Sequence, residues 1–353
     1  MLKEKLSTFK KEFDLELTKI LDKQLSDAQN VSLELEKLLS QMKKYSLAGG
    51  KRLRPFLFSE SYRGLTNKPC DIVSLSCFVE LVHLELLALD DIMDRSDTRH
   101  GVHTIHKSQQ RDCEKSEITG GCAHFGSSAG ILAGVMFGNI AMSVLANAPC
   151  SKKETLAVVD YYNKIIIDTA YGQYHDVYTS LKQAVSLDEV KRVHYYKTAR
   201  YTIEAPLVAG AYMAGLTDAE IEPIREFSRP LGHAFQIVDD LIGTFGSKEA
   251  LGKSPQSDLA EGKHTYLTVW ALLNGNAMQK EELATLLNKG EASENDLERF
   301  KSLLKDTNAY KHSVSQSKEY LKEALKALED TPFDSETRGA LGELAHFIVQ
   351  RDY

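Results

Sequence analysis

Apolar side chains recur at spacings of three and four residues along the longest segments of this 353-residue chain, which is the period of amphipathic helices. Segment 1–23 shows this period, and segment 77–89 is almost wholly apolar, which predicts a buried helix. Proline is scarce, with 8 residues, and no Gly/Ser-rich or Pro-rich linker marks a boundary. No hairpin dipeptide lies between alternating stretches. The pattern predicts an all-α fold and a single domain over residues 1–353.

Residues 118–151 contain no Asp, Glu, Lys or Arg, and this segment is long enough to span a bilayer. It carries one stripe of glycines, which suits close helix packing, and one polar stripe, which lipid would penalise. The two stripes are Gly130, Gly134 and Gly138, and Asn139, Ser143 and Asn147. The segment is therefore interpreted as a central or subunit-interface helix, with no transmembrane segment in the chain.

The composition narrows the class of protein. With 42% hydrophobic and 26% charged residues the chain resembles a soluble globular protein, and it excludes disordered, collagen-like and polytopic membrane proteins. Lys and Arg total 43 against 50 Asp and Glu, a net charge of −7, so no general positive field favours nucleic acid. Five cysteines without a CxxC pair predict reduced thiols. The N-terminus lacks the apolar stretch of a signal peptide, so a cytoplasmic location is expected.

Three carboxylates follow the apolar run at 77–89. Asp90 and Asp94 lie about 40° apart around a helix, and Asp91 sits beside them. Crowded carboxylates repel one another unless a cation neutralises them, and Mg²⁺ prefers oxygen ligands together with water and substrate phosphates. The alternative interpretation is a solvated acidic helix end.

A second apolar helical run ends in Asp239 and Asp240, with Gln236 one turn before them. Two buried helices that both end in adjacent aspartates are hard to explain as surface decoration, because unpaired carboxylates at the edge of a core are costly. If the two clusters face each other, they form a magnesium site. The alternative is that the second pair caps the following turn near Gly243.

Basic residues gather in the stretch GGKRLRP, where Pro55 can begin a helix. Lys51, Arg52 and Arg54 then converge near a helix N-terminus. Guanidinium forks, an ammonium group and free backbone amides suit a diphosphate, although short basic clusters are also typical of a solvated face.

Other candidate phosphate ligands lie further along the chain. One segment has Lys197 beside Thr198. The other is a loop containing glycine and proline that could close over phosphates, and it holds Lys253 and Lys263. The histidines of RHGVHTIH are spaced by three on a segment that contains glycine, which does not match a tetrahedral zinc site. Loop or phosphate-contact roles are therefore favoured for His100, His103 and His106.

Taken in order, these motifs resemble those of the trans-isoprenyl diphosphate synthases, the short-chain prenyltransferases related to farnesyl and geranylgeranyl diphosphate synthase. The resemblance covers about residues 45–270. It is carried by GGKRLRP, DDIMDRSDTRHG, GQYHD, KTARYTIEAPL, FQIVDDLIGTFG and GKSPQSDLAEGKHT. The family implies the isoprenoid synthase type I fold, a helical bundle around a central cavity, usually as a homodimer. It also implies Mg²⁺-dependent 1′-4 chain elongation of an allylic diphosphate by isopentenyl diphosphate in isoprenoid biosynthesis.

The resemblance assigns a role to each matching residue. Three Mg²⁺ ions are implied, with Asp90, Asp91 and Asp94 on two of them and Asp239 with Asp240 on the third. The allylic diphosphate would be held by Arg99, Lys197 and Lys253, with Lys263 in the same loop. Isopentenyl diphosphate would be held by Lys51, Arg54 and His83, together with His100 in place of a family arginine. Thr198 and Gln236 match positions that border the reacting allylic carbon.

Some positions depart from the family. Gly243 stands where a third aspartate of the second motif is usual, and Val135 replaces an acidic residue. Val82 and Leu86 can line the floor that limits product length. Glu85 replaces a frequent aromatic, and we expect it to turn aside or find a partner.

Without an aromatic floor the sequence favours geranylgeranyl diphosphate as product. Three alternatives are a farnesyl diphosphate synthase, a non-catalytic regulatory subunit and a class I terpene cyclase. The basic motif and the second aspartate pair speak against the cyclase.

Overall fold

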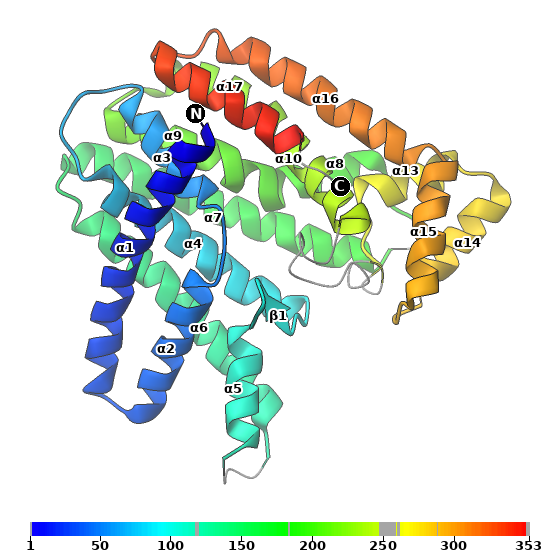
Figure 1. The fold of residues 1–353 in the computed structure, drawn as a ribbon, viewed down its shortest axis with the longest axis horizontal. Helices are drawn as coiled ribbons and strands as arrows, with labels where there is room; N and C mark the ends of the chain where they lie inside the picture. The colour runs from blue at the N-terminus through cyan, green and yellow to red at the C-terminus, as the bar shows by residue number, and fades with distance from the viewer. Residues whose placement is uncertain are drawn as a thin grey trace. The chain divides into compact units, whose positions relative to one another are not determined.

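A computed structural model describes residues 2–116, 120–182, 184–246, 259, 262–287 and 289–350. Over these residues the fold is all-α, as the helical spacing predicts, apart from one two-stranded hairpin (Figure 1). The chain forms two compact units. The N-terminal unit contains residues 1–59 and 67–159, and the C-terminal unit contains residues 60–66 and 160–353. A single domain over the whole chain stays a prediction.

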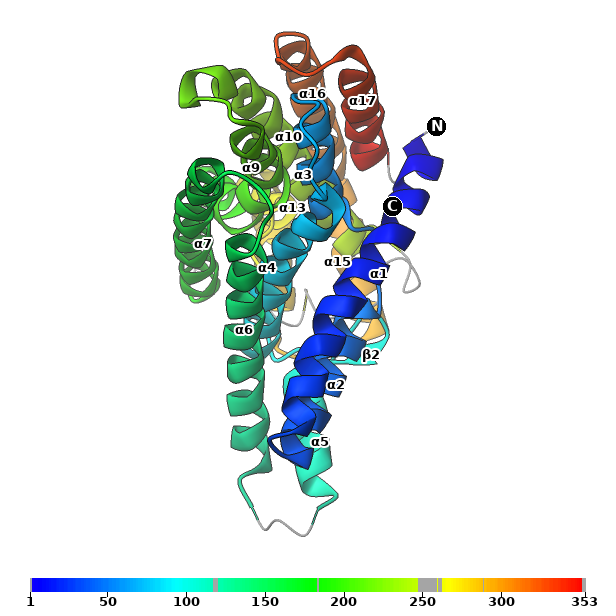
Figure 2. The ribbon, with the colours of Figure 1, turned by 90° about the vertical axis from the view of Figure 1, so that its left-hand side faces the viewer.

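The N-terminal unit is built from long helices around α4. Its elements are α1 (Leu2–Gln29), α2 (Leu33–Leu47), the first part of α3 (Leu53–Arg63), α4 (Ile72–Met93), β1 (Thr98–Arg99), β2 (Val102–His103), α5 (Ile105–Glu114) and α6 (Cys122–Ala146). Helices α1 and α2 lie side by side as an antiparallel pair (Figure 1 and Figure 2). Ser32 starts α2 by accepting a hydrogen bond from the Leu35 amide at 3.2 Å.

The glycine stripe of α6 faces α4. A Cβ atom on Gly130 would lie 2.8 Å from Ile92, and one on Gly134 would lie 3.1 Å from Leu89. Because glycine has no side chain, α4 can approach the α6 backbone closely. The close packing expected from the spacing of these glycines is confirmed.

The hairpin was not expected from the sequence. Strands β1 and β2 pair antiparallel, with Thr98 opposite His103 and Arg99 opposite Val102. The two residues between them, His100 and Gly101, have φ angles of 48° and 77°. Two consecutive positive φ angles are typical of the turn that suits the strand twist. The hairpin presents Arg99 and His100 at its tip.

The prediction of five reduced cysteines is wrong for two of them. Cys113 of α5 and Cys122 of α6 form a disulfide across nine residues of sequence. Their pairing depends on the packing of α5 against α6, and sequence spacing alone does not encode it. Cys70, Cys77 and Cys150 remain thiols.

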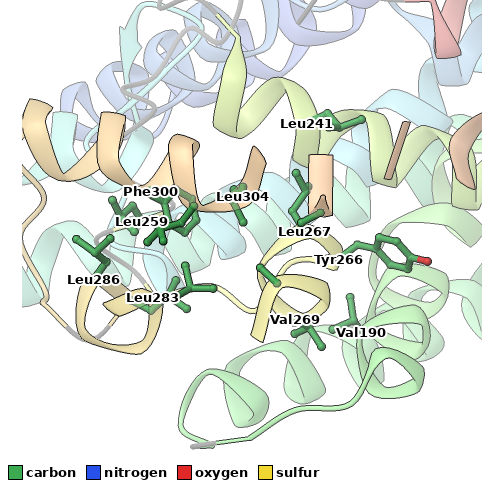
Figure 3. Close-up of a cluster of buried hydrophobic side chains, with 14 of the residues drawn as sticks. Val190, Leu241, Leu259, Tyr266, Leu267, Val269, Leu283, Leu286, Phe300 and Leu304 are labelled. Carbon is green, nitrogen blue, oxygen red and sulfur yellow. The ribbon is translucent and has the colours of Figure 1, made fainter. Parts of the chain in front are cut away.

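The C-terminal unit contains the rest of the described chain. Its elements are the larger part of α7 (Lys152–Ser180), α8 (Leu187–Val193), a π-helix η1 (His194–Glu204), α9 (Ala205–Ala214), α10 (Asp218–Phe245), α13 (Tyr266–Asn274), α14 (Ala277–Leu287), α15 (Glu294–Asp306), α16 (Ala309–Leu328) and α17 (Ser335–Val349). Figure 3 shows one of its apolar clusters, in which Leu241 of α10, Leu267 of α13 and Leu304 of α15 are each fully buried. This packing fixes the last turns of α10, where the second aspartate pair lies. The prediction that the helix ends at this pair is wrong, because α10 continues to Phe245.

Two described helices, α4 and α6, are long and apolar enough to cross a membrane by length and composition alone. Of the most apolar window in α4, 61% is buried inside the protein, which is typical of a core helix, against 44% for α6. The exposed apolar side chains of α6 include Phe125, Ile131, Leu132 and Val135. Helix α6 thus buries its glycine stripe and exposes an apolar outer face.

Candidate active site

The first aspartate motif lies at the C-terminal end of α4, where its carboxylates point in different directions. Asp91 is buried, with its side chain 1% exposed. It accepts hydrogen bonds from Tyr45 Oη at 2.6 Å and from Arg99 Nε at 2.8 Å. Burial raises the pKa of Asp91 in spite of Arg99, and burial next to Asp91 raises the pKa of Tyr45. Tyr45 is therefore a neutral donor, and Asp91 links α4 to α2 and the hairpin.

Asp90 and Asp94 lie one helical turn apart and are partly exposed. The Asp94 amide donates to the Asp90 carbonyl at 2.8 Å, which closes the last turn of α4. The side chain of Asp90 is 23% exposed, and Arg99 Nη2 lies 3.7 Å from its Oδ2. These two carboxylates supply the oxygen donors that Mg²⁺ prefers.

No group of three or more His, Cys, Asp or Glu residues able to hold a metal ion occurs among the described residues. The carboxylates therefore do not form an all-protein cage in this part of the chain. Mg²⁺ is usually bound by one or two carboxylates, with water and substrate phosphates as the other ligands. The donor set fits Mg²⁺ in that form.

The three basic residues predicted at 51–54 differ in burial: Lys51 is exposed, Arg54 is half-buried and Arg52 is buried. Arg52 is buried, and its three nitrogens donate to Asp14 at 2.8 Å, to Glu80 at 2.6 Å and to the Ser46 carbonyl at 2.8 Å. Arg52 therefore fastens α1, α2 and α4 together. The expectation that it converges on a diphosphate with its neighbours is wrong, because long-range acidic partners hold it inside.

Arg54 and His83 do come together, while Lys51 is exposed at the surface. Arg54 Nη1 lies 3.2 Å from His83 Nε2. A guanidinium can only donate, so His83 accepts with an unprotonated Nε2. Burial and the positive charge of Arg54 lower the pKa of His83 well below its usual range. The imidazole is therefore neutral and orients the guanidinium.

The tip of the β1–β2 hairpin reaches Gly49, which lies just before Lys51. A Cβ atom on Gly49 would lie 2.8 Å from the His100 ring, so only glycine allows this approach. Burial and Arg99 lower the pKa of His100. The other two histidines of the segment do not join it. His103 lies 2.6 Å from Arg111 Nη1, and His106 is buried in α5.

In the second aspartate motif, as in the first, one carboxylate is more exposed than its neighbour. Asp239 near the end of α10 is exposed, whereas the side chain of Asp240 is 9% exposed. Asp240 accepts hydrogen bonds from Gln236 Nε2 at 2.9 Å and from the Tyr266 amide at 3.3 Å, and His194 Nε2 lies 3.2 Å from its Oδ2. Asp240 therefore joins α10 to η1 and to the start of α13.

Gln236 has one polar atom in a distinctive position. Its amide nitrogen donates to Asp240, while its Oε1 is buried and accepts no hydrogen bond from any described residue. A buried amide oxygen with no donor costs free energy unless a ligand uses it. The partial negative charge of this oxygen suits an electron-poor carbon.

Lys197 and Thr198 lie in the π-helix, an element that is frequent at functional sites. A Cβ atom on Gly172 of α7 would lie 2.2 Å from the Lys197 amide nitrogen, so α7 and η1 are in backbone contact. Lys197 Nζ forms an ion pair with Asp176 of α7. Sequence reasoning missed Asp176 as its partner, although it belongs to the GQYHD motif.

Lys253 and Lys263 are the two lysines predicted in the loop before α13. Lys253 lies outside the described residues. Lys263 lies just before α13, and its carbonyl accepts from the Thr265 amide at 3.1 Å.

The positions predicted to limit product length lie along α4. Val82 is buried and Leu86 is half-buried. Glu85 turns to α6, where a Cβ atom on Gly138 would lie 2.5 Å from its Oε2. Burial raises the pKa of Glu85 to about 7. Of the two positions that depart from the family, Gly243 is buried in α10 and Val135 is exposed on α6.

Residues 36–304 match the polyprenyl synthetase family, which is most of the chain. The chain belongs to this family. The chain is 29% identical over 343 residues to an octaprenyl diphosphate synthase of Haemophilus influenzae, covering 96% of this chain and 97% of the relative. It is 32% identical over 324 residues to a short chain isoprenyl diphosphate synthase of Methanothermobacter thermautotrophicus, covering 90% and 91%. The chain is therefore a prenyl diphosphate synthase.

A solved structure supports the same fold. A geranylgeranyl pyrophosphate synthase from Corynebacterium glutamicum, crystallised with isoprenyl diphosphate and magnesium, superposes with a TM-score of 0.93 at 27% identity. The match covers 98% of this chain and 99% of that structure. The fold is the all-α isoprenoid synthase fold that the motifs imply.

Proposed function

We propose that this prenyl diphosphate synthase extends an allylic diphosphate with isopentenyl diphosphate in a Mg²⁺-dependent 1′-4 condensation that yields geranylgeranyl diphosphate. The observation that carries the elongation reaction is the pairing of Arg54 with a neutral His83 beside exposed Lys51. A class I cyclase has no use for such a second anion site. Val82 and Leu86, with no aromatic ring, support a product longer than farnesyl.

Magnesium would bind to the outward aspartates. Asp90 and Asp94 on α4 and Asp239 on α10 have the exposure and the oxygen donors for this, with three ions expected when substrate is bound. Asp91 and Asp240 would orient these helix ends through their hydrogen bonds. Bound Mg²⁺ would stabilise the negative charge of the departing diphosphate.

The protein's own groups would perform the remaining tasks. Lys51 and Arg54 would hold the diphosphate of isopentenyl diphosphate, with His83 fixing the guanidinium by accepting its hydrogen bond. Arg99, Lys197 and Lys263 would hold the allylic diphosphate. Gln236 would direct Oε1 at the allylic carbon, where positive charge develops, while its nitrogen stays fixed on Asp240.

A longer product is the second candidate. The octaprenyl diphosphate synthase of Haemophilus influenzae resembles this chain over 96% of its length, so the family match alone does not set product length. Leu86 separates the two candidates, because a floor side chain of this size blocks further growth only if it points into the path of the product.

The exposed outer face of α6 supports a homodimer. Phe125, Ile131, Leu132 and Val135 are each about half exposed, between 48% and 58%. A contiguous apolar face of this kind marks an interaction surface. We expect Leu132→Glu with Val135→Glu to yield monomers in light scattering after gel filtration. An unchanged mass would contradict the proposed interface.

One assay tests the activity. Purified protein is incubated with Mg²⁺, labelled isopentenyl diphosphate and allylic starters of five to fifteen carbons, and the products are separated by length. The expected product has twenty carbons, and fifteen or forty carbons would instead support farnesyl or octaprenyl synthesis. Release of hydrocarbon would support a cyclase, and inertness with every starter would support a non-catalytic subunit.

Paired substitutions at Leu86 sharpen the product assignment. Leu86→Phe should shorten the main product by one or more five-carbon units, and Leu86→Ala should lengthen it. The opposite directions make each variant the control for the other, since general damage would lower the yield without moving the length. An unchanged length distribution in both variants would show that Leu86 does not form the floor.

A further inference from the structure

Helix α6 has a cysteine pair at each end. At its start, Cys122 is joined to Cys113 of α5 in the disulfide already described. Beyond its other end, the Sγ of Cys150 lies 2.9 Å from the Sγ of Cys70, which comes just before α4 begins. The two pairs therefore connect both ends of α6 to the neighbouring elements of the same unit.

We propose that Cys70 and Cys150 are a second disulfide-forming pair, so that oxidation fastens α6 at both ends. Their separation of 2.9 Å is less than the contact distance of about 3.5–4.0 Å between unbonded carbon atoms. A bonded sulfur pair lies at about 2.05 Å, so only a small approach is needed. Both residues are partly exposed, and small thiol reagents can therefore reach them.

The reaction is a two-step thiol–disulfide exchange with glutathione disulfide as oxidant. The thiolate of one cysteine attacks glutathione disulfide, which forms a mixed disulfide and releases one reduced glutathione. The thiolate of the second cysteine then attacks the protein sulfur of that mixed disulfide and releases the second glutathione. In total two protein thiols lose two protons and two electrons, and one glutathione disulfide gains them.

The surroundings of the pair set the speed of this exchange. Burial and the neighbouring thiol raise the pKa of Cys70 to about 12, so little thiolate exists at neutral pH. Exchange should therefore accelerate as the pH rises above 7. The remaining cysteine, Cys77, is fully buried on α4 and serves as a matched control.

Counting free thiols tests the proposal directly. Full-length protein is equilibrated with glutathione disulfide at pH 8.5, denatured in N-ethylmaleimide and weighed intact. Each bridge removes two of the five cysteines, so two bridges leave one adduct, on Cys77, and one bridge leaves three. One adduct is the expected result. Five would overturn the proposal, and three would overturn it if the single bridge maps to Cys113 and Cys122. Cys150→Ser should give two adducts.

Peptide mapping identifies the bridge. Cleavage before Asp71 separates Cys70 from Cys77, and cleavage at Met136 and Met142 separates Cys122 from Cys150. A fragment that joins Cys70 to Cys150 supports the proposal. Any other partner for Cys70 would overturn it.

A thermal test measures what the bridge does. In a Cys113→Ser, Cys122→Ser background, oxidation should raise the melting temperature by about 5 °C, because the bridge closes a long loop. Adding Cys77→Ser should keep this shift, and adding Cys150→Ser should abolish it. A shift that survives Cys150→Ser would overturn the proposal. These readouts are independent of prenyl transfer, and an oxidised pair would argue against the reducing cytoplasm expected from the sequence.

Discussion

The two aspartate motifs share one arrangement but hold it with different chemistry. In each, one aspartate is more exposed than its neighbour, which is turned inward: Asp90 is partly exposed beside buried Asp91, and Asp239 is exposed beside Asp240. Asp91 is held by a guanidinium and a phenol, whereas Asp240 accepts hydrogen bonds from a side-chain amide and a backbone N–H and has an imidazole close by. In each pair, one aspartate can therefore serve as a metal ligand and the other anchors the helix through its contacts. The first anchor, Asp91, depends more strongly on charge because its partner is a guanidinium.

The largest expected effect comes from removing an outward carboxylate. Asp90→Ala and Asp239→Ala should each lower kcat by about 10³-fold, because each deletes electrostatic stabilisation of the departing diphosphate. Steady-state kinetics at saturating Mg²⁺ measures this. Circular dichroism melting should stay close to that of the parent protein, and near-normal turnover in either variant would contradict the ligand role.

Removing the charged anchor should cost stability. Asp91→Ala leaves Arg99 and Tyr45 without their shared acceptor, and the free energy of unfolding should fall by about 3–5 kcal/mol. Urea denaturation measures the change. Tyr45→Phe is the matched variant, which removes only the phenol and should cost about 1 kcal/mol. Equal losses in both would show that the Arg99 pair contributes nothing.

Removing the uncharged anchor should cost less. Asp240→Ala deletes the acceptor of two hydrogen bonds, neither of them from a guanidinium, and should lower the free energy of unfolding by about 2 kcal/mol. The same urea experiment gives the comparison. A loss greater than that of Asp91→Ala would reverse the ranking of the two anchors.

The smallest expected effect is a dependence of stability on pH that comes from a residue of α4. Five residues before the aspartate pair, α4 carries Glu85 whereas α10 carries the fully buried Ala234. The folded pKa of Glu85 is about 7, above its usual value, so the folded state binds the extra proton between about pH 4.5 and 7. Stability from this group is present at low pH and is lost as the pH rises through 7. The loss is about 2 kcal/mol, because solvent screens this half-buried carboxylate and reduces the full value of the shift.

Glu85→Gln isolates this contribution. The variant should match the parent at pH 5 and exceed its free energy of unfolding at pH 8, as measured by urea denaturation at each pH. Ala234→Gly provides a control on α10, because it changes stability without a dependence on pH in this range. A parallel pH profile for the parent and Glu85→Gln would contradict the assignment.

Helical spacing was sufficient to predict the all-α fold, the buried helix that ends at Asp90 and the close packing of the α6 glycines. It was not sufficient for the direction of each carboxylate. Asp90 and Asp91 are adjacent, and Tyr45, 46 residues earlier, together with Arg99 holds Asp91 inward. Such partners come from tertiary packing, and a local pattern contains no record of them.

The same limit explains the other differences from expectation. Arginine commonly binds phosphate, but ion pairs with Asp14 and Glu80 hold Arg52 inside the N-terminal unit. The hairpin at 98–103 is too short for an alternating pattern to be visible. The pairing of Cys113 with Cys122 follows from the packing of α5 against α6, which a count of cysteines does not reveal.

The wide winding of η1 has a consequence for natural variation in length. A π-helix accommodates more residues per turn than an α-helix does, so loss of one residue from His194–Glu204 would restore ordinary winding. Every side chain downstream of the deletion would then keep its place, while those upstream would rotate by about 100°. A deletion between Ala199 and Glu204 would therefore turn Lys197 and Thr198 away from their present direction, although neither residue had itself changed.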